Sequence, residues 1–249
     1  MTIKVAVLGA KGRMGATTCG AISEAPDLDL VATLDLGDDL NLLVKNGAEV
    51  VVDFTHPDAV MANLDYAISH GINVVVGTSG FSPAKLRTLE IWLATQPNVG
   101  ALVAPNFGLG AVLMMQFAAQ ASKYFESVEI IELHHPDKAD APSGTATRTA
   151  ELITEARDRV KKEAMPDATS SGLQGARGAK VGDVPIHSVR LRGLVAHQEV
   201  ILGDLGETLT IRHDSINRAG FMSGVLLGVR KVVQTPGLTF GLEHFLDLN

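Results

Sequence analysis

The stretch that decides the fold is IKVAVLGAKGRMG, residues 3–15, in which an apolar run leads directly into three glycines. Residues 3–8 are apolar on both faces apart from one lysine, which is typical of a strand buried in a parallel sheet. Gly9, Gly12 and Gly15 follow with the spacing G-x-x-G-x-x-G. Glycines at such a junction let the backbone approach a pyrophosphate, which the free N–H groups of the next helix attract.

A carboxylate supports this interpretation of the glycine loop. The spacing differs by one residue from the usual G-x-G-x-x-G, so the bare pattern is not specific. Asp35, however, lies 20 residues after Gly15 and directly after the second apolar run. A carboxylate at that place accepts a hydrogen bond from a ribose hydroxyl of a dinucleotide. The alternative is a glycine turn that binds no ligand, with Asp35 capping a local turn.

Further apolar runs alternate with helical patterns through the first hundred residues. The runs cover residues 29–34, 50–54, 73–76 and 100–104. Between them, Pro57 is expected at the first position of one helix, and Ser82 with Pro83 at the start of another. This alternation with short connections predicts an α/β fold with a Rossmann-like, doubly wound parallel sheet.

The ends of these runs carry the residues expected to form a cleft. In a parallel sheet the loops that follow the strands share the carboxyl edge, where ligands bind. The third run ends in residues 53–55. The later ends contribute Gly77, Thr78 and Ser79, and then Ala104, Pro105, Asn106 and Phe107.

The sequence changes in character after about residue 124, which predicts a second domain of α+β type. We expect a strand over residues 129–133, a polar loop to Pro142 and a helix from Ser143 towards Lys161. A Gly/Ser/Asp-rich stretch over residues 166–182 is expected to be a mobile loop. Three later runs alternate apolar with polar residues, as antiparallel strands with one wet face do: residues 187–191, 199–202 and 208–213.

The last part of the chain is predicted to return to the first domain. Phe221, Val225, Val229 and Val233 recur at every fourth position, so they form one apolar stripe of a helix. We therefore expect a dinucleotide-binding domain over residues 1–107, completed by residues 216–249. The second domain is expected over residues 108–215.

Composition limits the classes of function. The 249 residues carry 21 Lys and Arg against 28 Asp and Glu, a net charge of −7 that disfavours binding to nucleic acid or to a membrane surface. The single cysteine, Cys19, fits a reducing compartment, and MTIKVAVLGA does not resemble a signal peptide, so we expect a cytoplasmic protein. Residues 100–122 are uncharged over a bilayer-spanning length, but Pro105 and Gly108 favour a buried strand, a loop and a helix.

The segment ELHHPDKADAPSGTA, residues 132–146, combines proton donors with a site for an anion. His134 or His135 titrates near neutrality, and Lys138 is a second, cationic donor. The helix that follows offers its first N–H groups and hydroxyls to a carboxylate. The residues expected there are Ser143, Gly144 and Thr145.

This segment has two other interpretations, a metal site and a pair of surface histidines. Adjacent histidines with Asp137 and Asp140 suggest a metal site, but consecutive strand residues face opposite ways and no H-x-x-x-H spacing is present. We therefore expect no metal. The remaining alternative is a pair of surface histidines in a solvated loop.

The chain resembles the 4-hydroxy-tetrahydrodipicolinate reductases, also called dihydrodipicolinate reductases, of bacterial lysine and diaminopimelate synthesis. Residues 132–146 look like the signature of that family, and the glycine loop, residues 77–79, residues 104–107 and the tail from Arg218 match it in the same order. Lys11 and Arg13 resemble the actinobacterial branch. Ser79 stands where threonine is frequent, which keeps the hydroxyl.

The resemblance implies a role for each candidate residue. His134 is implied as proton donor and acceptor, and Lys138 as proton donor. The implied substrate ligands are His135, Gly144 and Thr145, to which the anion site adds Ser143. The residues implied to hold the cofactor are Gly9, Ala10, Lys11, Gly12, Arg13, Met14, Asp35, Gly77, Thr78, Ser79, Ala104, Pro105, Asn106 and Phe107. The family also implies a homotetramer in which the second domains pair their open mixed sheets.

The activity implied is reduction of 4-hydroxy-tetrahydrodipicolinate or dihydrodipicolinate, a cyclic dicarboxylate, to tetrahydrodipicolinate, with hydride from NADH or NADPH reaching ring C4. Asp35 repels the extra phosphate of NADPH, whereas Lys11 and Arg13 offset that repulsion, so we expect both cofactors to be used. Two alternatives stay open. One is another nicotinamide-dependent dehydrogenase of amino-acid metabolism, and the other is a non-catalytic NAD sensor.

Overall fold

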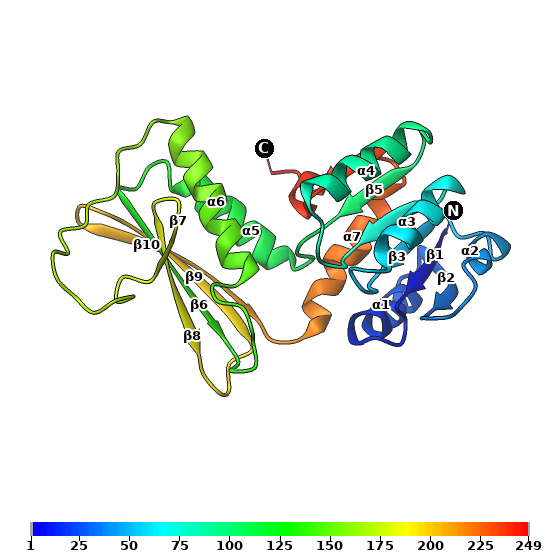
Figure 1. Cartoon of the computed structure of the whole chain (residues 1–249), viewed down its shortest axis with the longest axis horizontal. Helices are drawn as coiled ribbons and strands as arrows, with labels where there is room; N and C mark the ends of the chain where they lie inside the picture. Colours follow the sequence, from blue (N-terminus) through cyan, green and yellow to red (C-terminus); the bar gives the residue numbers. More distant parts are fainter. Residues whose placement is uncertain (1, 249) are drawn as a thin grey trace. The chain divides into compact units, whose positions relative to one another are not determined.

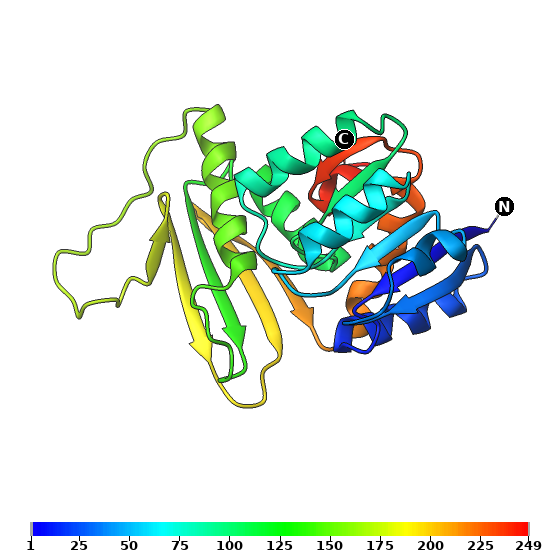
Figure 2. The same ribbon diagram turned by 45° about the vertical axis from the view of Figure 1, so that its right-hand side comes forward.

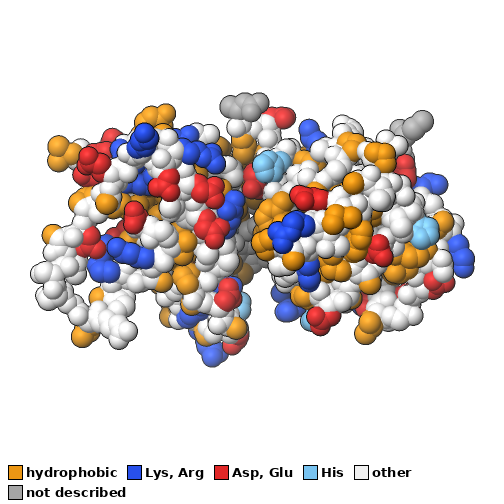
Figure 3. Space-filling model, turned by 45° about the horizontal axis from the view of Figure 1, so that its top comes forward, with side chains coloured by type: hydrophobic (Ala, Val, Ile, Leu, Met, Phe, Trp, Pro, Cys, Tyr) orange, Lys and Arg blue, Asp and Glu red, His pale blue; other side chains and the backbone are white. Residues whose placement is uncertain are grey.

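The computed structural model describes residues 2–248, which form two compact units. Unit 1 consists of residues 2–109 and 218–248, so the end of the chain returns to the part that the beginning forms. Unit 2 is continuous and spans Gly110–Asn217. On the face drawn in Figure 3, basic and acidic side chains are interspersed over the surface of both units.

Unit 1 is built on a six-stranded sheet in which every strand pair is parallel, as predicted (Figure 1). The strand order is β11-β5-β4-β3-β1-β2. Because β1 pairs with β2 on one side and with β3 on the other, the order reverses at β1, which is where open α/β sheets bind ligands. The strands are β1 (Ile3–Leu8), β2 (Leu28–Leu34), β3 (Val50–Asp53), β4 (Asn73–Val76), β5 (Gly100–Val103) and β11 (Gly237–Phe240).

Helices cover both faces of this sheet, which confirms the doubly wound arrangement (Figure 2). The helices α1 (Arg13–Glu24) and α7 (Met222–Val232) pack together on one face, and α3 (Val60–Ser69) with α4 (Pro83–Ala94) on the other. Val225 and Val229 of the predicted apolar stripe are fully buried. The shorter helices of unit 1 are α2 (Asn41–Lys45) and the 3₁₀ turns η1 (Arg218–Phe221) and η2 (Leu242–Phe245).

Of the two helix starts predicted from the sequence, the one at Ser82 is confirmed and the one at Pro57 is wrong. The Ser82 hydroxyl accepts from the Lys85 N–H with Pro83 in the first turn, as predicted. Pro57, by contrast, lies in a turn before α3, since the N–H groups of Ala59 and Val60 both donate to the carbonyl of His56. The sequence patterns also did not indicate α2 or β11, because both are short and carry no clear periodicity.

Unit 2 contains a five-stranded mixed sheet, in agreement with the prediction, with the order β10-β9-β6-β8-β7. The strands β6 and β8 are parallel, so the expectation that all later strands are antiparallel was wrong at this pair. The stretch over residues 166–182 is also not a loop throughout, because β7 lies inside it. The strands are β6 (Ser127–His134), β7 (Ala179–Val181), β8 (Val184–Arg190), β9 (Ala196–Asp204) and β10 (Glu207–Ser215).

Two helices accompany this sheet, α5 (Leu109–Ala121) and α6 (Gly144–Arg159). The uncharged run over residues 100–122 folds as β5, a loop and α5, as predicted. Within residues 2–248, no helix has both the length and the apolar character needed to cross a membrane.

A buried arginine ties α6 to the connection between α5 and β6. Arg157 is 5% exposed, and its guanidinium donates to the carbonyls of Ser122, Phe125, Glu126 and Glu163 at 2.9–3.1 Å. Burial lowers the pKa of this guanidinium below its usual range. Three of these carbonyls lie between α5 and β6 and the fourth follows α6, so Arg157 fixes both connections next to the start of β6.

Replacing Arg157 by methionine should lower the free energy of unfolding by about 3 kcal/mol or more, because four charge-assisted hydrogen bonds of a buried guanidinium are lost together. Urea unfolding followed by circular dichroism measures this change. Arg159→Met is the matched control, since that side chain is 78% exposed, and it should change stability by less than about 0.5 kcal/mol. Equal effects of the two substitutions would contradict the structural role of Arg157.

Candidate active site

The glycine loop of unit 1 forms a close backbone contact at the carboxyl edge of the sheet. Gly9 has a φ of +74°, and a Cβ added there would lie 2.5 Å from the carbonyl oxygen of Phe54. Only glycine fits this position, because both the backbone conformation and the space exclude a side chain. Gly9 therefore lets the loop pack closely on the turn after β3, just before the start of α1, where the N-terminus of a helix can attract a phosphate.

Asp35 fixes this loop from the end of β2. Its carboxylate accepts from the Lys11 N–H at 2.7 Å and from the Leu36 N–H at 2.9 Å. The hydrogen bonds from the Leu36 and Lys11 backbones hold the pKa of Asp35 below its usual range. An ionised carboxylate at this place retains lone pairs that can accept from a hydroxyl of a ligand.

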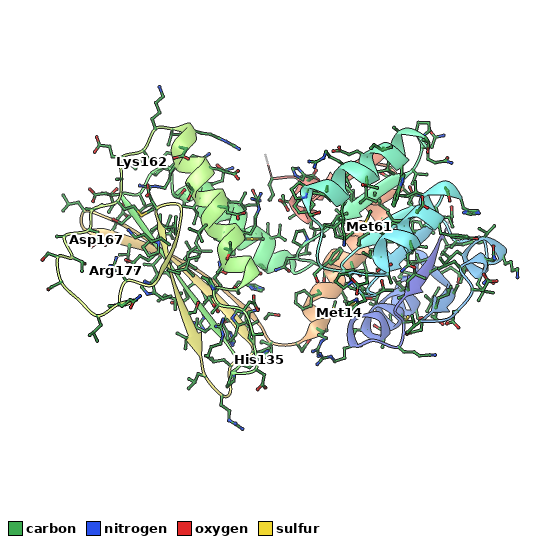
Figure 4. All side chains as sticks on the ribbon, viewed as in Figure 1. Met14, Met61, His135, Lys162, Asp167 and Arg177 are labelled. Atoms are coloured by element: carbon green, nitrogen blue, oxygen red, sulfur yellow. The ribbon has the colours of Figure 1, made fainter. Side chains whose placement is uncertain are left out.

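Two cavities open along the same edge of unit 1. The first has a volume of about 440 Å³ and the second about 240 Å³, and the Phe54 ring lines both. Of the predicted residues, Gly9, Gly12 and Asp35 line the first cavity. Those that line the second are Met14, Gly77, Ala104, Pro105, Asn106 and Phe107. Figure 4 labels Met14 at the start of α1.

The aromatic wall of the second cavity requires a glycine beside it. The rings of Phe54 and Phe107 meet edge to face, with centroids 5.8 Å apart. A Cβ at Gly77 would lie 2.1 Å from the Phe54 ring and 2.9 Å from the Phe107 ring. Gly77 therefore allows both rings to approach the turn after β4.

The remaining predicted cofactor residues lie in other surroundings. Thr78 is buried, and its hydroxyl donates to the fully buried carboxylate of Asp53 at 2.7 Å. Thr78 thus holds the turn in place through Asp53. The side chains of Lys11 and Ser79 are exposed on loops, and that of Arg13 is exposed at the start of α1. Ala10 donates its N–H to the carbonyl of Leu34, which joins the glycine loop to β2.

In unit 2, His134 lies at the end of β6 and contacts a buried carboxylate on the same strand. The distance from His134 Nδ1 to Glu132 Oε2 is 2.5 Å. Glu132 is fully buried, whereas the His134 side chain is 14% exposed. Burial lowers the pKa of His134, and this outweighs the opposing effect of Glu132.

Arg190, on the neighbouring strand β8, neutralises Glu132. Its two terminal nitrogens donate to the two oxygens of Glu132 at 2.8 and 2.9 Å, and one of them also donates to the carbonyl of Asp140 at 2.7 Å. Burial alone would raise the pKa of Glu132, but the hydrogen bonds from Arg190, Ser188 and His134 outweigh it and lower the pKa. Glu132 is therefore ionised, and Arg190 connects it to the loop that carries Lys138.

Lys138 and the start of α6 lie near this cluster. Lys138 Nζ donates to Asp140 Oδ1 at 2.7 Å, and its charge acts on His134 and lowers the pKa of that ring further. Ser143 is buried, and its polar groups are satisfied there: its hydroxyl accepts from the Ala146 N–H and its own N–H donates to Glu132. Gly144 is exposed and Thr145 half-buried at the first turn of α6. His135 is exposed in the loop after β6 (Figure 4).

The sequence analysis placed Phe54 at the expected cleft but did not single out Glu132 or Arg190 as parts of these sites. Glu132 stands inside the quoted segment two residues before His134, and period-2 alternation places both side chains on one face of a strand. That signal was available. Arg190 is 58 residues from Glu132 and meets it only because β6 and β8 pair, so nothing in the local sequence indicates it.

The fold and these loops define a class: a protein with a Rossmann-like unit whose carboxyl edge carries a glycine loop, joined to a second α/β unit. The family can be named from the sequence. The family models for the N-terminus and the C-terminus of dihydrodipicolinate reductase match residues 3–107 and 110–246. The chain belongs to the dihydrodipicolinate reductase family, a family of oxidoreductases.

Individual relatives agree with this assignment over their full length. The chain is 62% identical to the 4-hydroxy-tetrahydrodipicolinate reductase of Nocardia farcinica over 248 residues, which cover 100% of both chains. It is 60% identical to that of Streptomyces coelicolor, covering 99% of both. A dipicolinate-bound dihydrodipicolinate reductase from a Paenisporosarcina species has a TM-score of 0.90 and 37% identity, covering 99% of this chain and 100% of that one.

The charge cluster of unit 2 predicts a pH-dependent loss of stability in Arg190→Met. In the wild type, the lowered pKa of Glu132 stabilises the fold above the ordinary glutamate pKa, and this contribution is lost as the pH falls through the lowered value. Without Arg190, burial raises the pKa of Glu132 and the sign reverses. We expect a stability loss of about 3–5 kcal/mol at neutral pH that becomes smaller towards about pH 5.

Urea unfolding at both pH values measures this difference. Arg148→Met is the control, because Arg148 forms only partly exposed ion pairs along α6. A loss for Arg190→Met that is equal at both pH values would show that Glu132 does not respond to the guanidinium.

Proposed function

We propose that the protein reduces 4-hydroxy-tetrahydrodipicolinate or dihydrodipicolinate to tetrahydrodipicolinate with NADH or NADPH, in the synthesis of lysine and diaminopimelate. The observation that carries this proposal is the cluster of His134, Lys138 and the start of α6 in a chain of this family. Such a cluster offers a proton and a site for a carboxylate together.

The residues at the carboxyl edge of unit 1 fit a nicotinamide dinucleotide. The glycine loop, which lines the first cavity at Gly9 and Gly12, and the N-terminus of α1 suit the pyrophosphate, and the carboxylate of Asp35 suits a ribose hydroxyl. The second cavity, with its aromatic wall of Phe54 and Phe107, suits a flat ring. When bound, the reduced cofactor supplies a hydride to C4 of the substrate ring.

The substrate is proposed to bind unit 2 through its two carboxylates. The first turn of α6 offers backbone N–H groups at Gly144 and Thr145, and Lys138 offers a cation. Because the polar groups of Ser143 already cap the helix and donate to Glu132, we assign Ser143 to holding the helix start. His135, exposed in the adjoining loop, is proposed as a further ligand. A dipicolinate molecule bound to the Paenisporosarcina relative is consistent with a planar cyclic dicarboxylate.

The proton is proposed to come from the His134 and Lys138 pair. His134 is held by Glu132 through Nδ1, so Nε2 is the nitrogen left for proton exchange. Lys138 carries its ammonium in a loop that Arg190 anchors at Asp140. A cation there binds the substrate and supplies a proton as the hydride adds, so that one hydride and one proton add across one double bond of the ring, and the hydroxyl group of the hydroxylated substrate leaves as water.

Assembly into a homotetramer is proposed through the open face of the unit 2 sheet. On β6, the even-numbered positions 128, 130 and 132 are buried and the odd-numbered ones are half-buried. Ile131, Leu133 and Ile201 are apolar members of that half-buried face. The same face carries Glu129 with its partners His187 and Arg177, and we propose that this mixed apolar and charged face pairs with a second copy.

Two other functions are a different nicotinamide-dependent dehydrogenase and a non-catalytic NAD sensor. An amine dehydrogenase from Mycobacterium smegmatis has a TM-score of 0.64 at 12% identity, which shows a shared fold and no more. A different dehydrogenase would leave the His134 and Lys138 cluster unexplained. A non-catalytic NAD sensor would bind the dinucleotide without turnover, so an assay separates it from the proposed enzyme.

A coupled assay is the direct test. Dihydrodipicolinate precursor is generated in the cuvette by its synthase, and oxidation of NADH or NADPH is followed by absorbance. We expect turnover that depends on the precursor and is inhibited by dipicolinate. Binding of the dinucleotide without any oxidation would overturn the proposed activity.

Lys138→Ala should lower kcat by a factor of about 10²–10⁴ and raise the substrate KM, because the ammonium is proposed both to donate a proton and to bind a carboxylate. The fold should remain intact, since Lys138 lies in a loop. Lys162→Ala, a change in the exposed segment that follows α6, is the control and should retain wild-type kinetics. Most of the wild-type turnover in the Lys138 variant would exclude this residue from the reaction.

Cofactor use should be dual, with kcat/KM for NADH and NADPH within about tenfold, or ~1.4 kcal/mol. Asp35 opposes the extra phosphate, while the exposed cations Lys11 and Arg13 attract it. Raised salt should weaken NADPH more than NADH, because its added attraction is electrostatic and screened. Measuring kcat/KM for both cofactors at two ionic strengths tests this, and a hundredfold preference either way would contradict it.

A further inference from the structure

Glu132 connects every part of the unit 2 cluster. Its two oxygens accept from His134 Nδ1, from both terminal nitrogens of Arg190 and from the N–H of Ser143. The carboxylate is fully buried, although it lies beside groups that are proposed to meet the substrate. A buried carboxylate with this many donors is ionised and held in one position, because each donor restricts it from a different direction.

The residues that donate to Glu132 also make contacts elsewhere in the proposed substrate site. Arg190, from β8, also donates to the carbonyl of Asp140 in the Lys138 loop. Ser143 is the N-cap of α6, whose first turn is the proposed carboxylate site. His134, on β6, is the proposed proton carrier. The side chain of Glu132 thus contacts His134 on β6, Arg190, which anchors the Lys138 loop, and Ser143 at the start of α6.

The tautomer of His134 follows from this contact. An ionised carboxylate only accepts hydrogen bonds, so Nδ1 must carry the proton at 2.5 Å from Glu132 Oε2. The neutral ring then has its lone pair on Nε2. Second neighbours that fix a histidine tautomer in this way change catalytic rates strongly without touching the substrate.

We infer that Glu132 is the positioning residue of the proposed reaction: it holds His134 as the Nδ1–H tautomer, with Nε2 free for proton exchange, and holds the start of α6 beside it. The inference rests on the proposed function for its kinetic consequence. Its structural part, the tautomer, can be tested without turnover.

The first experiment measures the tautomer in the wild type. The protein has eight histidines, so ¹⁵N-histidine labelling with two-bond ¹H–¹⁵N correlations gives a spectrum that can be assigned, and His134→Gln identifies the signal of His134. We expect the proton on Nδ1 at neutral and higher pH. A proton on Nε2 would overturn the inference, whatever the enzyme reduces.

The second experiment compares Glu132→Gln with Glu129→Gln. Glu129 lies on the same strand but faces the other side of the sheet, where its carboxylate is 2.7 Å from His187 Nε2 and pairs with Arg177. Arg177 is labelled in Figure 4. Both substitutions therefore replace a carboxylate that contacts a histidine and an arginine. Only Glu132→Gln should lower kcat, by about 10–100-fold, while KM for NADH stays within about twofold because the dinucleotide residues are in unit 1.

The pH profile distinguishes positioning from a general loss of structure. Without the carboxylate the imidazolium of His134 is less stable, so the activity limb that requires protonated His134 should move to lower pH in Glu132→Gln. Glu129→Gln should keep the wild-type profile. Turnover and a profile in Glu132→Gln equal to those of the control would overturn the inference. If Glu132→Gln does not fold, or if the wild type shows no turnover, the tautomer of the wild type decides the inference alone.

Discussion

A carboxyl group that is fully removed from water must be surrounded by hydrogen-bond partners, and within residues 2–248 each unit contains one fully buried carboxyl group near the end of a strand. In unit 1, Asp53 at the end of β3 accepts from Thr55, Asn63 and Thr78. In unit 2, Glu132 accepts from His134, Arg190 and Ser143. The donors come from neighbouring strands, loops and helices, so satisfying one buried carboxyl group fixes the relative positions of several segments.

The two carboxylates shape different kinds of site. The hydrogen-bond partners of Asp53 are the neutral residues Thr55, Asn63 and Thr78. Through them Asp53 holds the turns after β3 and β4, which lie at the edge of the sheet where the two cavities open. Glu132 has an arginine and a histidine as partners, and it couples a titratable ring to a cation. The hydrogen bonds of Asp53 fix the positions of two turns, and those of Glu132 fix which nitrogen of His134 carries the proton. A reductase needs both, because a hydride donor must be placed and a proton must be available.

The sequence predicted most of unit 1 because its signals are local. The five runs from residue 3 to residue 104 correspond to β1–β5, and the glycine loop, Asp35 and the Ser82 cap lie where their patterns indicated. Edge strand β11 was missed because four residues that include Gly237 show neither alternation nor a long apolar run. In unit 2, the parallel pairing of β6 with β8 depends on contacts more than fifty residues apart, which no local periodicity encodes.

The same distinction explains which site residues the sequence could supply. His134, Lys138 and the start of α6 lie within twelve residues, so their residue types and spacing were enough to single them out as candidates. The residues that hold them are found through the sheet register: Ser188 and Arg190 stand opposite Glu132 and His134 on β8. Register is set by the burial of a whole strand face, since a slip of one residue would expose Glu132 and bury Leu133 in its place. The protonation state of His134 is therefore a consequence of how the entire sheet packs, and a substitution that shifts β8 against β6 should alter it as directly as the loss of Glu132 itself.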